Sequence, residues 1–334
     1  MDAMGGDHAP EEILLGVARA FEKGFLKPEE VALVGTRVAM EPCLSRTPIL
    51  KQCALHEATE NIEMGESPLK VLRKPHSSIM IAMDLVRRRE AAAFVSAGST
   101  GACVAGAWRV LGPLPKVDRP GIAVTFVGAS GPLTILDVGA NVHATPEHLL
   151  QYGVMGELFS SNVLGVKAPR VALLNIGAEE EKGNRLVKRT RELFESAGFN
   201  FAGNVEGNDL LTGKADVVVC EGFVGNVVLK VFEGVGHYFY DAVRGSLQDA
   251  SAAQSPLGQA VRAITQKLDY AEYGGAPLLG VNGLVMIMHG RSDRRAMANA
   301  LHVSAQFVKA DVNRQIGDAF QRANGQSGAA GEPA

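Results

Sequence analysis

The feature that most constrains the fold of this chain is a repeated unit: a short apolar run, a loop with glycine and polar residues, and then an amphipathic stretch. The apolar runs are rich in Val, Ile and Leu and nearly continuous in hydrophobicity, which is typical of strands covered on both faces of a parallel sheet. Their alternation with helical patterns predicts an α/β fold with a largely parallel sheet. We expect strands at 31–35, 92–98, 121–128, 133–139, 170–177, 215–222 and 283–290.

The amphipathic stretches between these runs predict helices at 8–23, 76–90, 100–111, 146–163, 184–197, 225–248, 256–270 and 292–316. The segment 112–121, "GPLPKVDRPG", contains too much Pro and Gly for a helix and is expected to be a connector. Residues 323–334 are small, polar and rich in glycine, which predicts a disordered tail. We expect residues 1–322 to form a single α/β/α unit.

Four of the predicted strands run into glycine loops that lead to helices, in "VSAGSTGA", "DVGANVHATPE", "NIGAEEEKGN" and "CEGFVGNV", and the opening "DAMGGDHAP" has the same form without its strand. The carboxyl ends of parallel strands meet at one edge of a sheet, where open α/β sheets bind ligands. Glycine permits close backbone approach, and the first amides of a helix attract anions. One such corner is as often a simple strand-to-helix joint, but five together favour a shared anion-binding cleft.

Composition narrows the class of protein. The chain has 334 residues, of which 46% are hydrophobic and 21% charged, with a formal net charge of −3. This balance is typical of a soluble globular protein and argues against a general nucleic-acid binder. The absence of an early apolar segment and of any run long enough to span a membrane predicts a cytoplasmic protein.

Several common chemistries lack their motifs. The sequence has no nucleotide-binding P-loop, no dinucleotide fingerprint, no zinc-protease helix and no nucleophile elbow. The eight histidines form no convincing ligand pair, and cysteines 43, 53, 103 and 220 lack metal-ligand spacing. We therefore predict no metal and no cofactor, and we interpret Cys220 as a small buried strand residue in preference to a nucleophile.

Six motifs taken together resemble one family. They are "DAMGGDHAP", "VSAGSTGA", "LDVGANV", "LLNIGAEEEKGN", "GNVEGNDLLTGKADVVVCEGFVGNV" and "YGGAPLLGVNG", in the family's order and across residues 2 to about 316. The resemblance is to the bacterial PlsX family, the acyl-[acyl-carrier-protein]:phosphate acyltransferases. It implies a three-layer α/β/α sandwich similar to phosphotransacetylases and isopropylmalate dehydrogenases, plus a protruding helical hairpin.

The resemblance also implies a reaction, in which a fatty acyl-carrier protein and inorganic phosphate give acyl phosphate for phospholipid synthesis. Phosphate can attack the thioester directly, so no covalent intermediate is required. The implied catalytic residues are Lys182 and Asn226. The implied phosphate- and substrate-binding residues are Gly5, Gly6, Asp7, His8, Gly98, Ser99, Thr100, Gly101, Asp137, Asn141, Gly177, Glu206 and Gly225.

Several of these residues also have a plainer interpretation. Lys182 is otherwise a solvated lysine paired with Glu179, Glu180 or Glu181, Asn226 an N-cap, and His8 a surface histidine at a helix start. We expect Asp137 and Glu206 to order their loops, because a carboxylate repels phosphate, and Asp7 to cap the first helix. Three positions depart from the family pattern, namely Ser99, His143 and Asn208. Family members also usually carry an apolar strand before the opening aspartate, so we expect either an upstream start or an absent strand.

The partners are implied in the same way. The hairpin at 226–270 is expected to form a homodimer through a four-helix bundle, with Val227, Val228, Val231 and Val235 as a seam or core stripe. Its tip, "DASAAQS", is too polar for firm membrane insertion, so we expect at most loose association with the inner face of the membrane and a glycerol-phosphate acyltransferase there. "VRRRE" (86–90) and "GRSDRR" (290–295) are candidate docks for the acidic carrier protein, and solvated helix ends otherwise.

Three alternatives remain open. One is a phosphotransacetylase-like enzyme that uses acyl-coenzyme A. Another is a decarboxylating dehydrogenase, which would need metal-binding aspartates and an arginine cluster that the sequence lacks. The third is a non-catalytic scaffold for enzymes of lipid synthesis.

Overall fold

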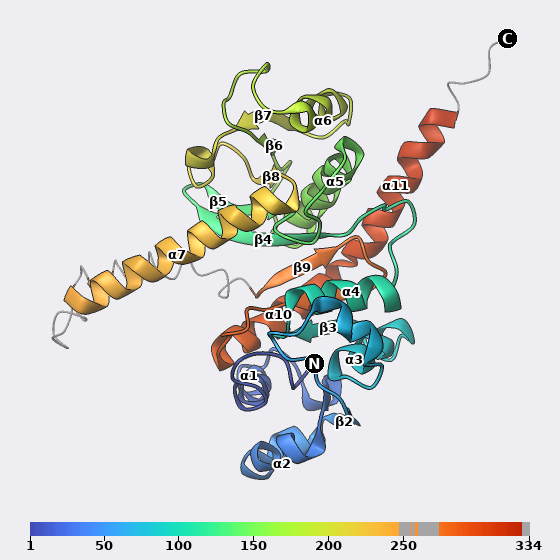
Figure 1. Cartoon of the computed structure of the whole chain (residues 1–334), viewed down its shortest axis with the longest axis vertical. Helices are drawn as coiled ribbons and strands as arrows, with labels where there is room; N and C mark the ends of the chain where they lie inside the picture. The colour runs from blue at the N-terminus through green and yellow to red at the C-terminus, as the bar shows by residue number, and fades with distance from the viewer. Residues whose placement is uncertain (247–254, 256–257, 260–273, 329–334) are drawn as a thin grey trace. The chain divides into compact units, whose positions relative to one another are not determined.

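The computed structural model of the chain describes residues 1–246, 255, 258–259 and 274–328 (Figure 1). The chain forms two compact units, the first from residues 1–122 and 274–334 and the second from residues 123–273. The sequence predicts a single unit over 1–322, and whether the two units act as one body stays a prediction.

The first unit contains parallel and antiparallel strands surrounded by helices. Strand β10 pairs in parallel with β3 and antiparallel with β9, and β1 pairs in parallel with β2. The elements are α1 (Glu11–Glu22), β1 (Ala32–Gly35), α2 (Arg37–Arg46), β2 (Ala54–Glu57), α3 (Ser78–Arg87), β3 (Ala93–Ser96), α4 (Thr100–Val110), β9 (Ala276–Leu279), β10 (Leu284–Ile287), α10 (Arg294–Ala310) and α11 (Val312–Gly328). Short 3-10 helices η1 (Pro28–Glu30), η2 (Pro48–Gln52) and η3 (Pro68–Arg73) join them.

The opening segment takes the place of a strand in this unit. The amide of Ala3 donates to the carbonyl of Val34 at 2.9 Å, and the amide of Asp2 donates to the carbonyl of Val95 at 3.0 Å. Residues 1–3 thus bridge β1 and β3. The glycine corner "MGGDHAP" therefore does follow a short extended segment, in the same way as the other four corners follow strands.

The second unit has a sheet with the strand order β4-β5-β8-β6-β7. Strands β4 and β5 form an antiparallel hairpin, whereas β5, β8, β6 and β7 are mutually parallel. The elements are β4 (Gly121–Gly128), which starts in the first unit, β5 (Gly131–Leu136), α5 (Pro146–Asn162), β6 (Val171–Leu174), α6 (Arg185–Glu195), β7 (Phe201–Val205), η4 (Gly207–Asp209), β8 (Val217–Val219) and α7 (Gly222–Ser246).

Close packing of helices and strands explains several residues of this unit. The three valines of β8 are buried, and Gly156 of α5 brings that helix so near that an added Cβ would lie 2.6 Å from Cγ1 of Val217. Helix α5 begins with Thr145 as its N-cap and Pro146 in its first turn, a favourable start signal. Helix α5 therefore packs closely against one face of the sheet.

The predicted α/β class with a mostly parallel sheet is confirmed, and some boundaries need correction. The predicted helix 292–316 is two helices, because Asp311 adopts a left-handed conformation with φ of 49° and ends α10. Helix α1 starts at Glu11 with Pro10 at its N-cap position, so Asp7 does not cap it. Helix α7 starts at Gly222, one turn earlier than predicted.

The C-terminal predictions have mixed outcomes. Helix α11 extends to Gly328, beyond residue 323, where the tail was predicted to begin. Most of the second hairpin helix and of its connecting segment lies outside the described residues. No helix in the described ranges combines the length and the apolar character needed to cross a membrane.

Candidate active site

The corner after β5 is organised by a buried carboxylate. Asp137 has no exposed surface, and its oxygens accept hydrogen bonds from the amides of Gly139, Ala140 and Asn141 at 3.0, 2.9 and 2.8 Å. The side-chain amide of Asn141 donates to the hydroxyl of Tyr152 at 2.8 Å. These bonds confirm that Asp137 orders the loop. They also mean that these three amides are already occupied by the protein's own carboxylate.

The corner after β8 is locked onto the Asp137 loop. The amide of Gly222 donates to the carbonyl of Asn141 at 2.9 Å. Gly225 lies against the carbonyl of Asp137, where an added Cβ would overlap with the oxygen. Both contacts require glycine, because a side chain has no room there. The two loops therefore pack directly against each other.

The first turn of α7 carries its own anion. The carboxylate of Glu221 accepts from the amides of Phe223 and Val224 at 2.7 and 3.2 Å. The structure corrects the position of Asn226, which the sequence predicts at the start of this helix. It lies in the second turn, with its amide group 3.6–3.7 Å from the point where a Cβ on Gly139 would be. Asn226 is thus placed over the glycine loop and does not cap the helix.

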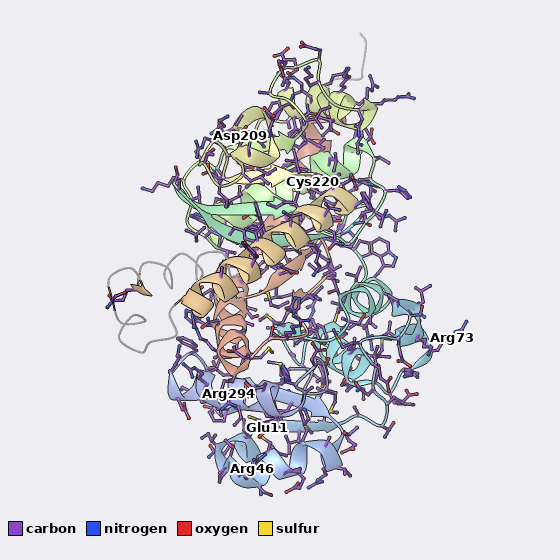
Figure 2. The ribbon with its side chains drawn as sticks, turned by 60° about the vertical axis from the view of Figure 1, so that its left-hand side comes forward. Glu11, Arg46, Arg73, Asp209, Cys220 and Arg294 are labelled. Carbon is purple, nitrogen blue, oxygen red and sulfur yellow. The ribbon has the colours of Figure 1, made fainter. Side chains whose placement is uncertain are left out.

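Cys220 directly follows β8 and is chemically unreactive. Its side chain is buried, and its thiol lies 3.6 Å from the carbonyl oxygen of Asp137 (Figure 2). Burial raises the pKa of the Cys220 thiol well above its usual range, with further contributions from the charges of Asp137 and Glu221. A thiol that stays protonated is a poor nucleophile, in agreement with its interpretation as a core residue.

The corner after β6 holds Lys182 over a glycine. The side-chain amide of Asn175 donates to the carbonyl of Lys182 at 3.2 Å, and Gly183 adopts a φ of 93° next to it. An added Cβ on Gly177 would lie 2.8 Å from Cγ of Lys182, so the lysine stem passes across that glycine. Asn175 thus shapes this loop, a role that the sequence motifs do not indicate.

The ammonium of Lys182 is exposed and forms no ion pair with any residue that the structure describes. Glu180, one of its proposed partners, instead pairs with Arg191 at 2.6 Å. The N-cap of α6 is Asn184, whose side chain accepts from the amide of Val187 at 3.0 Å. Among the described residues, the amides of Arg185 and Leu186 have no such acceptor. This corner combines a lysine ammonium that has no ion pair with open helix amides, an arrangement that suits an anion.

Glu206 follows β7 and has a local structural role. Its amide donates to the carboxylate of Asp209 at 3.2 Å, and its carbonyl accepts from the amide of Asp209 at 3.0 Å. Asp209 in turn pairs with Lys214 at 2.6 Å. These bonds involve the backbone of residue 206, and the positioning role of the Glu206 carboxylate stays a prediction.

A hollow of about 480 Å³ lies beside these corners in the second unit. Its walls come from the loop after Asn141, from the start of α6 and from the start of α7. The lining residues are Val142, His143, Ala144, Asn184, Leu186, Glu221 and Phe223.

In the first unit, the opening corner and the corner after β3 pack against one another. The buried carboxylate of Asp2 accepts from the hydroxyl of Ser96 at 2.6 Å, and that hydroxyl accepts from the amide of Gly98 at 2.9 Å. An added Cβ on Gly5 would lie 2.6 Å from the nitrogen of Gly98. The predicted neighbours Gly5 and Gly98 are therefore in backbone contact, and Asp2 and Ser96 hold them.

The remaining residues predicted in the first unit surround this contact. Gly6 has a φ of 108°, and the amide of Asp7 donates to the carbonyl of Gly290 at 2.7 Å. Asp7 and His8 are exposed. Helix α4 begins at Thr100, and its N-cap Ser99 makes no side-chain capping bond. Gly101 permits close contact with Pro68. That the corners of both units share one cleft stays a prediction.

Some arginines of the two basic stretches, 86–90 and 290–295, form ion pairs within the protein. Arg87 and Arg88 pair with Asp84 at 2.6 and 3.0 Å. Arg294 pairs with Glu12 across α1 and α10, near the Glu11–Arg46 pair (Figure 2). Their role in docking a carrier protein stays a prediction. Within the described ranges, no group of three or more His, Cys, Asp or Glu side chains is placed to hold a metal ion.

The chain is similar to known proteins over most of its length. Residues 1–315 match the model of a family described as fatty acid synthesis protein. The chain is 44% identical to the phosphate acyltransferase of Desulfitobacterium hafniense over 95% of both chains, and 40% identical to that of Aquifex aeolicus over 95% of this chain and 94% of the relative.

Solved structures agree on the fold. A phosphotransacetylase from Streptococcus pyogenes superposes with a TM-score of 0.62 at 15% identity, covering 92% of this chain and 94% of the other. A branched-chain phosphotransacylase from Enterococcus faecalis superposes with a TM-score of 0.59 at 14% identity, covering 92% and 97%. The α/β/α sandwich is therefore confirmed. The chain belongs to the fatty acid synthesis protein family, alongside relatives named phosphate acyltransferase, and it is an enzyme of the acyltransferase class.

Proposed function

We propose that this enzyme transfers a fatty acyl group from an acyl-carrier protein thioester to inorganic phosphate and releases acyl phosphate. The acyl phosphate would serve phospholipid synthesis, through a glycerol-phosphate acyltransferase at the membrane. In this proposal the acyl donor is a carrier protein. The enzyme itself is a cytoplasmic homodimer with loose membrane contact, and it uses no cofactor.

One observation supports the proposal above all others. Three glycine corners follow β5, β8 and β6, which are adjacent and parallel. All three therefore lie at the carboxyl edge of one sheet, the usual ligand-binding edge of open α/β folds. They bring a lysine without an ion pair, open helix amides and an asparagine amide to this edge, and no activated nucleophile.

The phosphate is assigned to the corner after β6. Lys182 supplies a positive charge, and the amides of Arg185 and Leu186 point along the start of α6, where an anion is stabilised. The amides of Gly139, Ala140 and Asn141 are not available, because Asp137 already occupies them. Phosphate binding therefore depends on the Lys182 corner more than on the Asp137 loop.

The chemical step balances without a covalent intermediate on the protein. A phosphate oxygen attacks the thioester carbonyl carbon, and a C–O bond forms as the carbonyl electrons move onto oxygen. The Lys182 ammonium and the Asn226 amide donate to the developing oxyanion. When the carbonyl re-forms, the C–S bond breaks and the carrier protein leaves as a thiolate, which takes a proton from solvent. Holding both substrates together contributes most of the remaining rate acceleration.

The direct test is product formation. Purified protein is incubated with acyl-carrier protein and phosphate, and acyl phosphate is trapped with hydroxylamine. We expect phosphate-dependent acyl hydroxamate. A folded protein that forms none with any thioester donor would refute the proposed function and favour a scaffold. Competition between acyl-carrier protein and acyl-coenzyme A then identifies the preferred donor.

A further inference from the structure

The hollow of the second unit has apolar walls at its solvent-exposed side. Phe223 and Val142 are 60% and 56% exposed, although both are large apolar residues. Ala144 and Leu186 complete the apolar part of the lining. Exposed apolar side chains that gather around a concavity indicate a binding site more often than an accident of the surface.

The polar residues of the hollow are mostly engaged by the protein itself. Both carboxylate oxygens of Glu221 accept amides of α7, and the side-chain oxygen of Asn184 accepts the amide of Val187. Apart from the open backbone amide of Leu186, which is assigned to phosphate, the groups that remain for a ligand are the imidazole of His143 and the side-chain amide nitrogen of Asn184. A strongly polar ligand would therefore find few partners, whereas a hydrocarbon chain would displace water from apolar walls.

The hollow adjoins the residues assigned to the reaction. Val142 directly follows Asn141, and Asn184 lies two residues after Lys182. The bond from the Gly222 amide to the Asn141 carbonyl holds the Val142 and Phe223 walls in a fixed relation. A ligand that reaches the Lys182 corner thus has an apolar hollow next to its reactive end.

We propose that this hollow binds the first carbons of the acyl chain, counted from the thioester carbonyl, and sets the chain-length preference. The proposal rests on the proposed function and identifies the part of the donor that the second unit recognises. Phe223 forms the outer wall, and Ala144 limits the room inside. The valine stripe further along α7 is not part of this site and keeps its predicted role as a dimer seam.

The test measures how kcat/KM depends on chain length for acyl thioesters from acetyl to decanoyl. Each methylene that is fully buried should raise kcat/KM about fourfold. Each methylene of a chain that keeps one side in contact with water should raise it about twofold. We expect Phe223→Ala to flatten this rise. We expect Ala144→Leu to stop this rise in kcat/KM at a shorter chain. Val38→Ala is the matched control, since Val38 is an exposed apolar residue of α2 in the first unit.

A binding measurement separates this inference from the proposed function. Calorimetry with alkylphosphonates, from methyl to decyl, reports chain recognition without turnover. If no donor is turned over but affinity rises with chain length and Phe223→Ala abolishes the rise, the hollow is an acyl site and the proposed function is wrong. If turnover is normal but both hollow variants keep the wild-type dependence on chain length, the hollow proposal is wrong. An equal loss for every chain length would also overturn it.

Discussion

Gly225 offers a sharp test of how the active-site corners are held together. The glycine lies in the first turns of α7, directly against the backbone of Asp137. A Cβ at this position would overlap with the Asp137 carbonyl oxygen, and it would lie only 2.9 Å from the carbonyl carbon and 3.0 Å from Sγ of Cys220. The obstacle is backbone, which cannot rotate away. Replacement by alanine must therefore separate α7 from the Asp137 loop by about 1 Å.

The magnitude follows from three contributions. Overpacking of a tight site costs about 1–3 kcal/mol. The hydrogen bond from the Gly222 amide to the Asn141 carbonyl would be weakened, at a cost of about 1 kcal/mol. The higher helix propensity of alanine offsets about 1 kcal/mol. We therefore expect Gly225→Ala to lower the free energy of unfolding by about 1–3 kcal/mol and to lower phosphate-dependent acyl transfer.

Gly234 provides the matched control in the same helix. A Cβ added there meets no atom of the described residues within 4 Å, so Gly234→Ala should gain about 1 kcal/mol from helix propensity. Urea unfolding followed by circular dichroism measures both variants, at one protein concentration and with the oligomeric state checked by gel filtration. If Gly225→Ala proves as stable as Gly234→Ala, the close contact that locks the two corners does not exist.

Three further predictions concern charge and burial. Lys182→Ala should lower kcat about 100-fold, with Lys182→Arg partly restoring it, while the free energy of unfolding stays within about 0.5 kcal/mol; an unchanged kcat would remove Lys182 from the mechanism. Burial by itself raises the pKa of Asp216, but the bonds from Arg170, with Nε and Nη2 both at 2.9 Å, outweigh it and leave the pKa lowered. The stabilisation by this pair is therefore present above about pH 4, the unfolded pKa, and is lost as pH falls through the lower folded value, so acid titration of unfolding should be shallower for Asp216→Asn than for the wild type. All four cysteines are buried, and burial raises the pKa of Cys53 to about 11 and of Cys103 to about 12, so a thiol reagent at neutral pH should label the protein only after denaturation; rapid labelling of the folded protein would contradict this.

Most of the fold could be predicted because its strands are strongly apolar and its helices amphipathic. Elements with weak patterns were missed. Strand β7, "FAGNV", mixes polarities and contains Gly203 with a φ of 83°, and β9 follows two glycines with positive φ. Helix α2 contains Pro42 and has little amphipathic character. The break at Asp311 was missed for another reason: the helical pattern continues across it, and only the backbone conformation of one residue ends α10.

The glycine corners could be located from the sequence, but the partners of their amides could not. The motif "DVGAN" offers a carboxylate and several amides without indicating that they bond to each other. Glu221 is similar: the charge pattern marks it as one more acid, whereas the structure places its carboxylate on the first amides of α7. Such bonds depend on loop conformation, which a linear pattern does not encode.

The buried aspartates give a physical reason why acidic residues surround a site proposed to bind anions. Asp2 and Asp137 have no exposed surface. Asp137 accepts bonds from amides of its own glycine corner, and Asp2 accepts from the amide of Met4 and from the hydroxyl of Ser96. A carboxylate held this way preorganises a loop that contains too much glycine to order itself, because it replaces lost conformational freedom with charge-assisted bonds. Its charge is spread over amides and does not need solvent. At the edge of the second unit, Lys182 has no ion pair with any described residue, so its ammonium offers a positive charge to an anion that reaches this edge.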